Sequence, residues 1–177
     1  MPTIFSHAVV PIATGLGLGQ KVSKQVIILS AFCAMLPDID TIGFKFGLPY
    51  GAAWGHRGAT HSIVFALAVA LTAAVFAKKF NSHFYITYFM VFVATISHGL
   101  LDMCTNGGLG VALYWPFSTQ RLFFDFHPIQ VSSIGITNFF TQRSFGILQS
   151  EFFWLVLPSI AWLMLLRLFR LRAFRKQ

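Results

Sequence analysis

The sequence predicts an all-α fold, a polytopic membrane bundle of about four to five hydrophobic helices with a long, aromatic-rich outer loop. Three observations support this fold class: 56% of the 177 residues are hydrophobic, only 10% are charged, and 13 Lys and Arg stand against five acids. A soluble domain carries roughly a quarter charged residues, so this chain cannot cover a water-facing surface. The composition excludes a disordered chain, a disulfide-rich secreted scaffold and an ordinary cytosolic protein.

The expected helices follow from the apolar stretches, which are residues 8–19, 22–36, 62–77, 84–101 and 152–169. Spanning a bilayer takes roughly 20 mostly apolar residues, with a lower limit of about 17. The last two stretches meet this limit and the third is marginal. The first two are shorter and are separated by Lys21 and Lys24, which predicts a helical hairpin that either spans with interfacial flanks or re-enters the membrane.

We expect one membrane-embedded domain over 1–177, with the chemically interesting motifs within 7–121 and a terminal transmembrane helix at 152–172. Two outer loops are expected, at 37–60 and 106–150. The second is long and rich in aromatic residues, which is typical of a lid or of short amphipathic segments in the membrane interface. Glycines at 15, 17 and 19 favour close helix packing in the first hairpin.

The basic residues predict the orientation in the membrane. They gather at Lys21 and Lys24, at Lys78 and Lys79, and in the C-terminal stretch 167–176. The positive-inside bias places all three clusters, the C-terminus included, on the cytoplasmic side of five crossings. The C-terminal cluster also suits a contact with anionic membrane lipids. Nucleic acid is not expected as a partner, because the basic residues flank apolar helices and form no separate basic module.

Most of the rare ionisable side chains fall on the opposite, outer face of this topology. They are His7, Asp38, Asp40, His56, His61, His98 and Asp102. Ionisable groups at membrane depth are costly and usually mark a function or pair with one another. We therefore expect these residues to converge on one site at the outer face.

The local spacings suit a metal site. His98 and Asp102 are four residues apart and share one helix face. Asp38 and Asp40 follow a proline, where an extended chain would point both side chains the same way. His61 joins them if the loop before it folds back. Imidazole nitrogens and carboxylate oxygens suit Zn²⁺, Mn²⁺ or Fe²⁺, and these five residues are predicted metal ligands because buried carboxylates need a compensating charge.

Other polar residues are assigned smaller roles. His7 and His56 are predicted as ligands or as hydrogen-bond partners of ligands. Arg57 can pair with a carboxylate or with an anionic substrate group. His83 is expected to be an ordinary interfacial residue, and Glu151 to interact with the dipole at the start of the last helix. Asp125 and His127 are a less favoured second metal site, and Cys33 and Cys104 are not expected to form a disulfide.

Taken in order, these motifs resemble the YdjM-like family of inner-membrane, metal-dependent hydrolases. The resemblance is carried by His7, Pro37-Asp38-Ile39-Asp40, His56-Arg57-Gly58-Ala59-Thr60-His61-Ser62, His98-x-x-x-Asp102, and Trp115-Pro116-Phe117-Ser118 with Arg121. It covers the chain from His7 to about Arg121, roughly two-thirds of its length. The resemblance implies a membrane-bound hydrolase that uses a metal ion.

The order of these ligands is also similar, more distantly, to the all-helical zinc phospholipase C and single-strand nuclease group, which hydrolyses phosphodiesters with three zinc ions. That similarity implies that Asp38 or Asp40, with His61, His98 and Asp102, holds one metal, and that Asp102 with His7 reaches a second. The later ligands of that group have no counterpart after Asp102. We therefore expect one or two metal ions rather than three, with Zn²⁺ as the first candidate.

The resulting hypothesis is hydrolysis of a phosphoester in a lipid or lipid-linked substrate by a metal-activated water. Asp40 or His56 would orient or deprotonate the water, and Arg57 would stabilise negative charge. Two alternatives remain at this point. A metal-binding or metal-transporting protein would need polar residues continuing through the bilayer, and a helical interaction protein would use the polar cluster only for packing.

Overall fold

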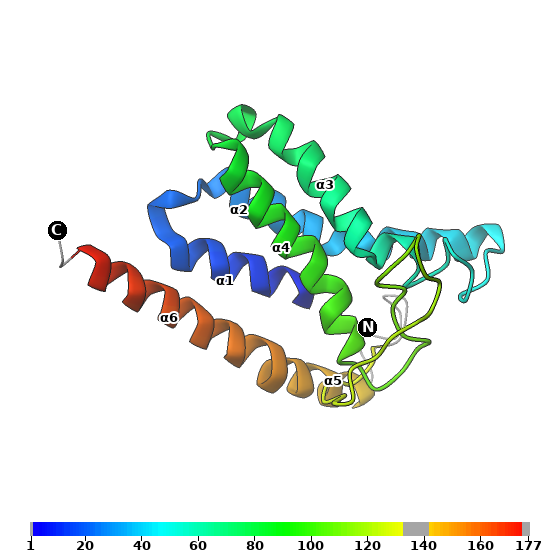
Figure 1. Cartoon of the computed structure of the whole chain (residues 1–177). Coiled ribbons are helices and arrows are strands. Elements are labelled where there is room, and N and C mark those ends of the chain that lie inside the picture. Colours follow the sequence, from blue (N-terminus) through cyan, green and yellow to red (C-terminus); the bar gives the residue numbers. More distant parts are fainter. Residues whose placement is uncertain (1, 133–141, 175–177) are drawn as a thin grey trace.

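The computed structural model describes residues 2–132 and 142–174 of the chain. Helices dominate the described residues, and outside them the chain forms only isolated bridges such as Thr105–Ile129 and Val111–Leu122. The expected all-α bundle is confirmed (Figure 1).

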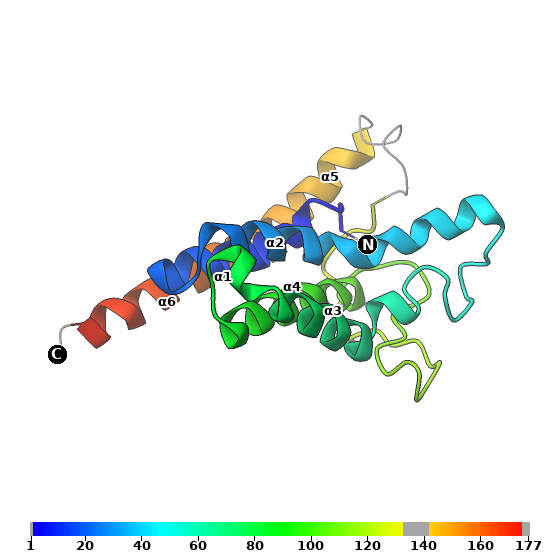
Figure 2. The ribbon, with the colours of Figure 1, turned by 90° about the horizontal axis from the view of Figure 1, so that it is seen from above.

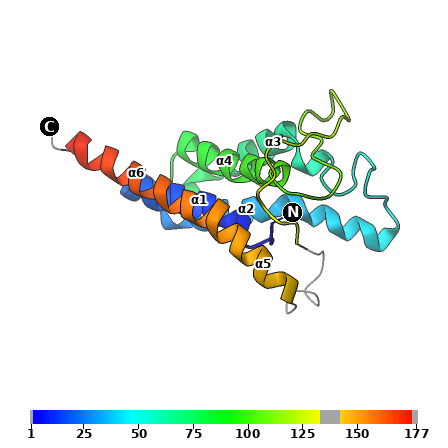
Figure 3. The same ribbon diagram turned by 90° about the horizontal axis from the view of Figure 1, so that it is seen from below.

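The bundle is built from two antiparallel hairpins and a long C-terminal helix. The hairpins are α1 (Val9–Leu18) with α2 (Lys24–Met35), and α3 (Ile63–Val75) with α4 (Phe84–Met103). Helix α4 packs against α1, α2 and α3, so it lies at the centre. Helix α5 (Gln142–Glu151), the π-helical segment η7 (Phe152–Val156) and α6 (Leu157–Phe174) form one continuous rod. This rod runs alongside α1 (Figures 1 and 3).

Hydroxyl side chains fix two helix starts. Ser23 accepts the Val26 amide at 3.2 Å at the start of α2, and Ser62 accepts the Phe65 amide at 3.1 Å at the start of α3. Each serine thereby satisfies a backbone donor that the first turn of a helix leaves free. Ser62 is therefore the N-cap of α3, and His61, one residue before it, lies at the entrance of the helix.

Small residues let α1 lie close to its neighbours on two sides. A Cβ added at Gly15 would come within 2.5 Å of Ile27, and one added at Gly17 would come within 2.8 Å of Leu166. Gly15 therefore faces α2, and Gly17 faces α6. The close helix packing expected from the glycine pattern is confirmed.

Within the described residues, three helices are long and apolar enough to cross a membrane: Lys24–Phe46, Phe84–Met103 and Ser144–Arg172. Helix α3 is a shorter apolar helix. The α1–α2 turn, the α3–α4 turn and the C-terminal end of α6 lie at the same end of the bundle (Figure 1). The structure thus brings the three basic clusters to one end, as the sequence predicts. Which side of the membrane that end faces stays a prediction.

Two loop expectations are corrected. Residues Leu36–Phe46 form a 3₁₀ helix, η3, that extends α2 beyond the bundle (Figure 2). Its second residue is a proline, which suits a helix start because its fixed φ is helical and its missing N–H is not needed there. The expected 106–150 loop ends early, since α5 begins at Gln142. Part of that loop, residues 133–141, lies outside the described residues.

The described part of this loop packs on the end of the bundle opposite the basic clusters. The Ala112 amide donates to the Arg57 carbonyl at 2.9 Å, and the Ile63 amide donates to the Leu113 carbonyl at 3.0 Å. Val111 and Ile129 are buried. The loop therefore covers the end of α3 and α4, where the polar residues lie.

Candidate metal centre

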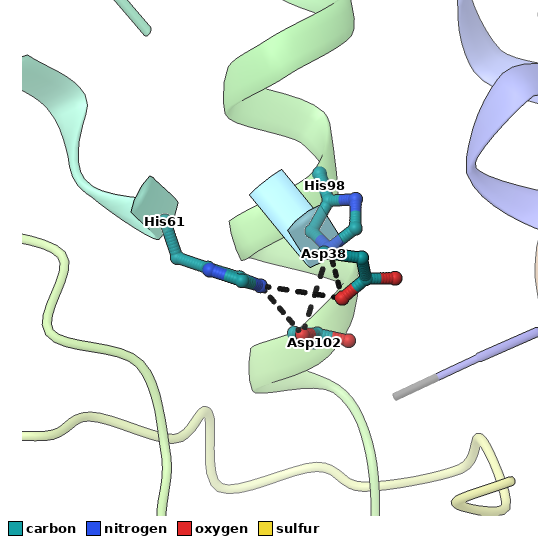
Figure 4. Close-up of side chains that lie close together, drawn as sticks. All are labelled: Asp38, His61, His98 and Asp102. Atoms are coloured by element: carbon teal, nitrogen blue, oxygen red, sulfur yellow. Dashed lines mark ion pairs between the residues drawn. The ribbon is translucent and has the colours of Figure 1, made fainter. Parts of the chain in front are cut away.

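Four buried side chains from three parts of the chain meet at this covered end. His98 and Asp102 project from α4, Asp38 from η3 and His61 from the short 3₁₀ turn η4 (Ala59–His61), and their donor atoms point toward one another (Figure 4). None of the four is more than 3% exposed. We call these residues the four-donor cluster.

The spacing of the donor atoms suits a metal ion. His98 Nε2 is 3.3 Å from Asp38 Oδ1 and 3.8 Å from Asp102 Oδ2. His61 Nε2 is 3.7 Å and 3.4 Å from the same two oxygens. A tetrahedron with metal–ligand bonds of about 2.0–2.1 Å has edges of about 3.4 Å. The four separations are therefore close to the edges that a bound Zn²⁺ would require.

Hydrogen bonds on the far side of each imidazole leave Nε2 available. His98 Nδ1 donates to the Ala34 carbonyl at 2.6 Å, because a carbonyl only accepts, so in the neutral ring Nε2 is the nitrogen that can bind a metal ion. His61 Nδ1 lies 3.2 Å from Asp40 Oδ2. A carboxylate or carbonyl behind a metal-binding histidine fixes its tautomer and orientation, and both histidines have such a partner.

Asp40 is bound to its neighbours on both oxygens. Oδ1 lies 2.8 Å from His56 Nδ1, while Oδ2 accepts the Thr60 hydroxyl at 2.6 Å and the Arg57 amide at 3.2 Å. Asp40, His56 and His61 form a second group whose donor atoms lie close enough for a metal ion. In the four-donor cluster Asp40 serves as the support of His61.

The chain after Pro37 is not extended, and this expectation is wrong, although both carboxylates reach His56 and His61. The segment is a 3₁₀ helix of three residues per turn, so side chains two positions apart diverge by about 120°. Asp38 faces His98 and Asp40 faces His56. The divergence puts one carboxylate inside the four-donor cluster and the other behind His61.

The chain between His56 and His61 folds back as the convergence of these residues requires. Arg57 adopts a positive φ of 61°, which is unusual for a non-glycine residue. His56 and His61 then lie edge to face, with ring centroids 5.5 Å apart. Both rings contact Asp40, so the loop expectation holds.

His7 lies next to the cluster. Its ring stacks on that of His98 with centroids 3.6 Å apart, and its Nε2 is 3.9 Å from Asp102 Oδ1. The side chain is fully buried. His7 thus contacts the ring of the predicted ligand His98, and it lies near Oδ1 of the predicted ligand Asp102.

Arg57 pairs with a carboxylate, the first of its two predicted alternatives. Its Nε is 3.1 Å from Asp102 Oδ2, Nη1 donates to the Gly107 carbonyl and Nη2 donates to the Thr105 hydroxyl, both at 2.9 Å. The side chain is fully buried. All three nitrogens of the guanidinium therefore have a partner within the protein, and the side chain neutralises and orients Asp102.

Other polar residues lie apart from the cluster. Asp125 and His127 are exposed and belong to neither metal-competent group, and His83 is an exposed residue preceding α4. Cys33 packs in a core cluster, and both cysteines are free.

The expectation for Glu151 is wrong: it lies inside the long C-terminal helix, where no free helix N-terminus exists. It is buried and accepts hydrogen bonds from the Thr3 amide and hydroxyl and from the Ser6 hydroxyl. Glu151 thereby ties the N-terminal segment that carries His7 to this helix.

Comparison with known proteins identifies the family. A model of a family described as YdjM inner membrane protein matches residues 1–173. The chain belongs to this family. It is also 38% identical over 162 residues to the inner membrane protein YbcI of Escherichia coli (strain K12), covering 90% of this chain and 94% of that protein. No solved structure matches the chain.

The donor atoms of this YdjM family member fit a cation. Among the described residues, both oxygens of Asp38, Oδ1 of Asp102, and Nε2 of His61 and of His98 are buried without a hydrogen-bond partner, while Asp102 Oδ2 is paired with Arg57 Nε at 3.1 Å. Such groups are costly unless a partner satisfies them. Burial lowers the pKa of His61, but the nearby carboxylates of Asp102, Asp38 and Asp40 raise it by more, to about 10. The surroundings therefore favour a positive charge here, either a proton or a metal ion.

Some residues of the YdjM site were not singled out from the sequence. Thr60 and Thr105 position Asp40 and Arg57, and the Ala34 carbonyl positions His98. Thr60 lies directly before His61, so its place beside a predicted ligand was an available signal. Thr105 and Ala34 carry no such signal, because their contacts join segments far apart in the chain.

Asp40→Asn separates support from direct ligation. If Asp40 acts behind His61, the variant is expected to keep one metal per chain at saturation while its affinity falls about 10–100-fold, the usual cost of losing such a partner. Competition with a chromogenic chelator measures the affinity, and Asp125→Asn in the exposed loop is the matched control. Loss of all binding would show that Asp40 is itself a ligand, and unchanged affinity would exclude the supporting role.

Proposed function

We propose that this protein is a membrane-embedded, metal-dependent hydrolase acting on a phosphoester of a lipid or lipid-linked substrate. The observation that carries the proposal is the four-donor cluster, whose four donor atoms are buried and lie within 4.8 Å of one another, with several of its oxygens and both Nε2 atoms without a hydrogen-bond partner. Asp38, His61, His98 and Asp102 are the proposed ligands. The phosphoester rests on the similarity of the motif order to zinc phospholipases.

The depth of the cluster supports a lipid substrate. At a rise of about 1.5 Å per residue, the 18 residues from Phe84 to Asp102 span about 27 Å. The hydrocarbon core of a bilayer is about 30 Å thick. If the basic end lies at one interface, the cluster lies close to the opposite one, where lipid head groups are located. We infer that this is the outer face, on the charge bias of the sequence.

The charges of the site support a single divalent ion. Asp38, Asp40 and Asp102 carry three negative charges, and the buried Arg57 carries one positive charge. Two negative charges remain when the histidines are neutral, and one divalent cation balances them. Buried charges that lack a counter-charge are strongly destabilising, so a second ion would need an anion to accompany it.

In this proposal a divalent transition metal, with Zn²⁺ the first candidate, supplies Lewis acidity that lowers the pKa of a bound water toward about 7. The protein groups supply the remaining roles. His56 is held by Asp40 through Nδ1 at 2.8 Å, which leaves Nε2 as its basic nitrogen for proton transfer. Arg57 stays paired with Asp102 and limits the negative charge that an anionic substrate would meet.

The test combines metal content with hydrolysis. Protein purified in detergent is expected to contain about one transition metal per chain and to release a phosphorylated head group, or phosphate, from phospholipid or lipid-linked phosphoester substrates. Chelation should abolish turnover, and adding the metal back should restore it. Protein that contains no stoichiometric metal, or that turns over equally after the metal is removed, would refute the proposal.

One observation favours a second candidate, a non-catalytic metal-binding protein. Four protein donors already complete a tetrahedral set, as in structural zinc sites, whereas catalytic zinc sites keep a position open. Cobalt-substituted protein separates the two functions, because only an open position lets inorganic phosphate change the visible spectrum. An unchanged spectrum together with absent turnover would favour the non-catalytic function.

Metal transport finds less support. Between the cluster and the basic end, the buried side chains of α2 and α4 that could meet an ion are the hydroxyls of Ser30, Thr87 and Thr95 and the single thiol of Cys33. Three hydroxyls and one thiol make a poor path for a transition-metal ion, for which imidazole, thiolate and carboxylate are the usual ligands. Metal flux into proteoliposomes would nevertheless establish transport.

A further inference from the structure

An apolar hollow of about 470 Å³ lies between α1, α4 and the C-terminal rod. Its lining includes Val10 and Thr14 of α1, Val93 and Leu101 of α4, Trp154 of the π-helical segment and Trp162 of α6. Figure 3 shows α1 and the C-terminal rod running side by side along this part of the bundle. We call this hollow the α1–α4–α6 groove.

The groove has a buried floor and an aromatic rim. Thr14 and Leu155 are 3% and 2% exposed, whereas Phe89, Trp154 and Trp162 are about half exposed. Trp162 Nε1 donates to the Thr14 hydroxyl at 3.2 Å, and that hydroxyl donates to the Val10 carbonyl at 2.9 Å. The polar atoms at the floor are thus satisfied within the protein. The groove therefore offers apolar surface and rings.

One end of the groove lies at the level of the four-donor cluster. Leu101, which lines the groove on α4, immediately precedes Asp102, and Val10, which lines it on α1, follows His7 by three residues. His7 in turn stacks on His98. None of the cluster residues lines the groove itself. A ligand lying in the groove would therefore have one end at the level of the proposed metal ligands.

The surroundings and the size of the groove decide its occupant. Two of its walls, α4 and the C-terminal rod, belong to helices long and apolar enough to cross a membrane, so we expect its open side to face lipid hydrocarbon. One turn of a helix about 10 Å across and about 5.4 Å long occupies roughly 420 Å³, so the groove is too small for a helix of a second copy to cross. A flexible hydrocarbon chain fits a hollow of this size and lining.

We propose that the α1–α4–α6 groove binds one acyl chain of a membrane lipid and so presents the head group of that lipid to the four-donor cluster. The acyl-chain site stands on the groove itself. The presentation of the head group rests on the proposed hydrolase function.

The test uses a phospholipid that carries a photoreactive diazirine on one acyl chain, with the full-length protein in lipid nanodiscs. A second apolar groove of about 420 Å³, lined by α2 and α3 residues, provides an internal reference. Irradiation followed by peptide mass spectrometry is expected to place the cross-links mainly on the lining of the α1–α4–α6 groove. Equal labelling of both grooves would show ordinary boundary lipid and would overturn the proposal.

Two matched substitutions sharpen the test. Val93→Trp fills the α1–α4–α6 groove, and Val69→Trp fills the reference groove; both valines are partly buried. The first is expected to remove most of the cross-linking and the second to leave it unchanged. Should Val93→Trp fail to fold, Ser159→Leu on the α6 side fills the same groove. Cross-linking that persists in a folded groove-filling variant would refute acyl-chain binding.

The two proposals fail in different ways. If the protein is no hydrolase, the cross-linking pattern still tests the groove. If the protein is a hydrolase and the groove binds no chain, Val93→Trp should hydrolyse long-chain lipid as the unsubstituted protein does. If both proposals hold, Val93→Trp loses turnover of long-chain lipid and keeps its metal and its turnover of a short, water-soluble phosphodiester.

Discussion

Replacing His98 by alanine is expected to eliminate stoichiometric metal binding and, with it, hydrolysis. His98 Nε2 lies 3.3 Å from Asp38 Oδ1 and is held in place by the Ala34 carbonyl behind it. Losing a supporting hydrogen-bond partner of a ligand lowers metal affinity about 10–100-fold. His98→Ala removes a proposed ligand itself, so its metal affinity should fall by more than that. Metal analysis of the purified variant, together with a chelator titration, measures the effect.

The matched control for His98→Ala is His127→Ala. His127 is exposed in the outer loop and belongs to neither metal-competent group. Its removal should leave metal content and turnover unchanged. A His98→Ala protein that folds, retains one metal per chain and remains fully active would refute both the assignment of the ligands and the proposed hydrolase function.

Replacing Arg57 by methionine is expected to cause the largest loss of stability. The guanidinium is fully buried and its Nε is 3.1 Å from Asp102 Oδ2. Removing one partner of a buried ion pair leaves the other charge uncompensated and costs about 3–5 kcal/mol. The two hydrogen bonds to Gly107 and Thr105 are lost as well. Unfolding in detergent, followed by circular dichroism, measures the change in free energy.

Arg167→Met is the control for Arg57→Met, because Arg167 is an exposed cation on α6. Its free energy of unfolding should change little, since exposed charges contribute about 0–1 kcal/mol. The metal adds a second criterion. If Arg57 balances Asp102, the loss of stability should persist when both proteins are saturated with metal. A loss below about 1 kcal/mol in Arg57→Met would contradict the ion pair as a main support of the site.

The site itself was partly predictable from the sequence. The pair His98 and Asp102 needs only the regular spacing of one helix, and the structure places both on the same face of α4. The pair Asp38 and Asp40 was misjudged, because the direction of their side chains depends on whether the chain after Pro37 is extended or helical. Packing of η3 against α4 and η4 accompanies the helical form.

Long-range partners were beyond the reach of local patterns. Glu151 is separated from Thr3 by 148 positions, and Arg57 from Thr105 by 48. No spacing rule connects such residues, since their contact depends on how helices far apart in the chain are placed. The sequence indicates only that a buried acid and a buried base will need partners.

By itself, the sequence determined the membrane fold class, the approximate helices and a group of His and Asp residues that the structure brings together. These follow from hydropathy, from helix periodicity and from the cost of ionisable groups in hydrocarbon, which are properties of local composition. Only the tertiary structure decided that Asp38 enters the four-donor cluster, that Asp40 contacts His61 from behind, that Arg57 pairs with Asp102 and that an apolar groove lies between α1, α4 and α6. Each of these depends on the relative placement of separate helices, because a few ångströms decide which oxygen faces which nitrogen.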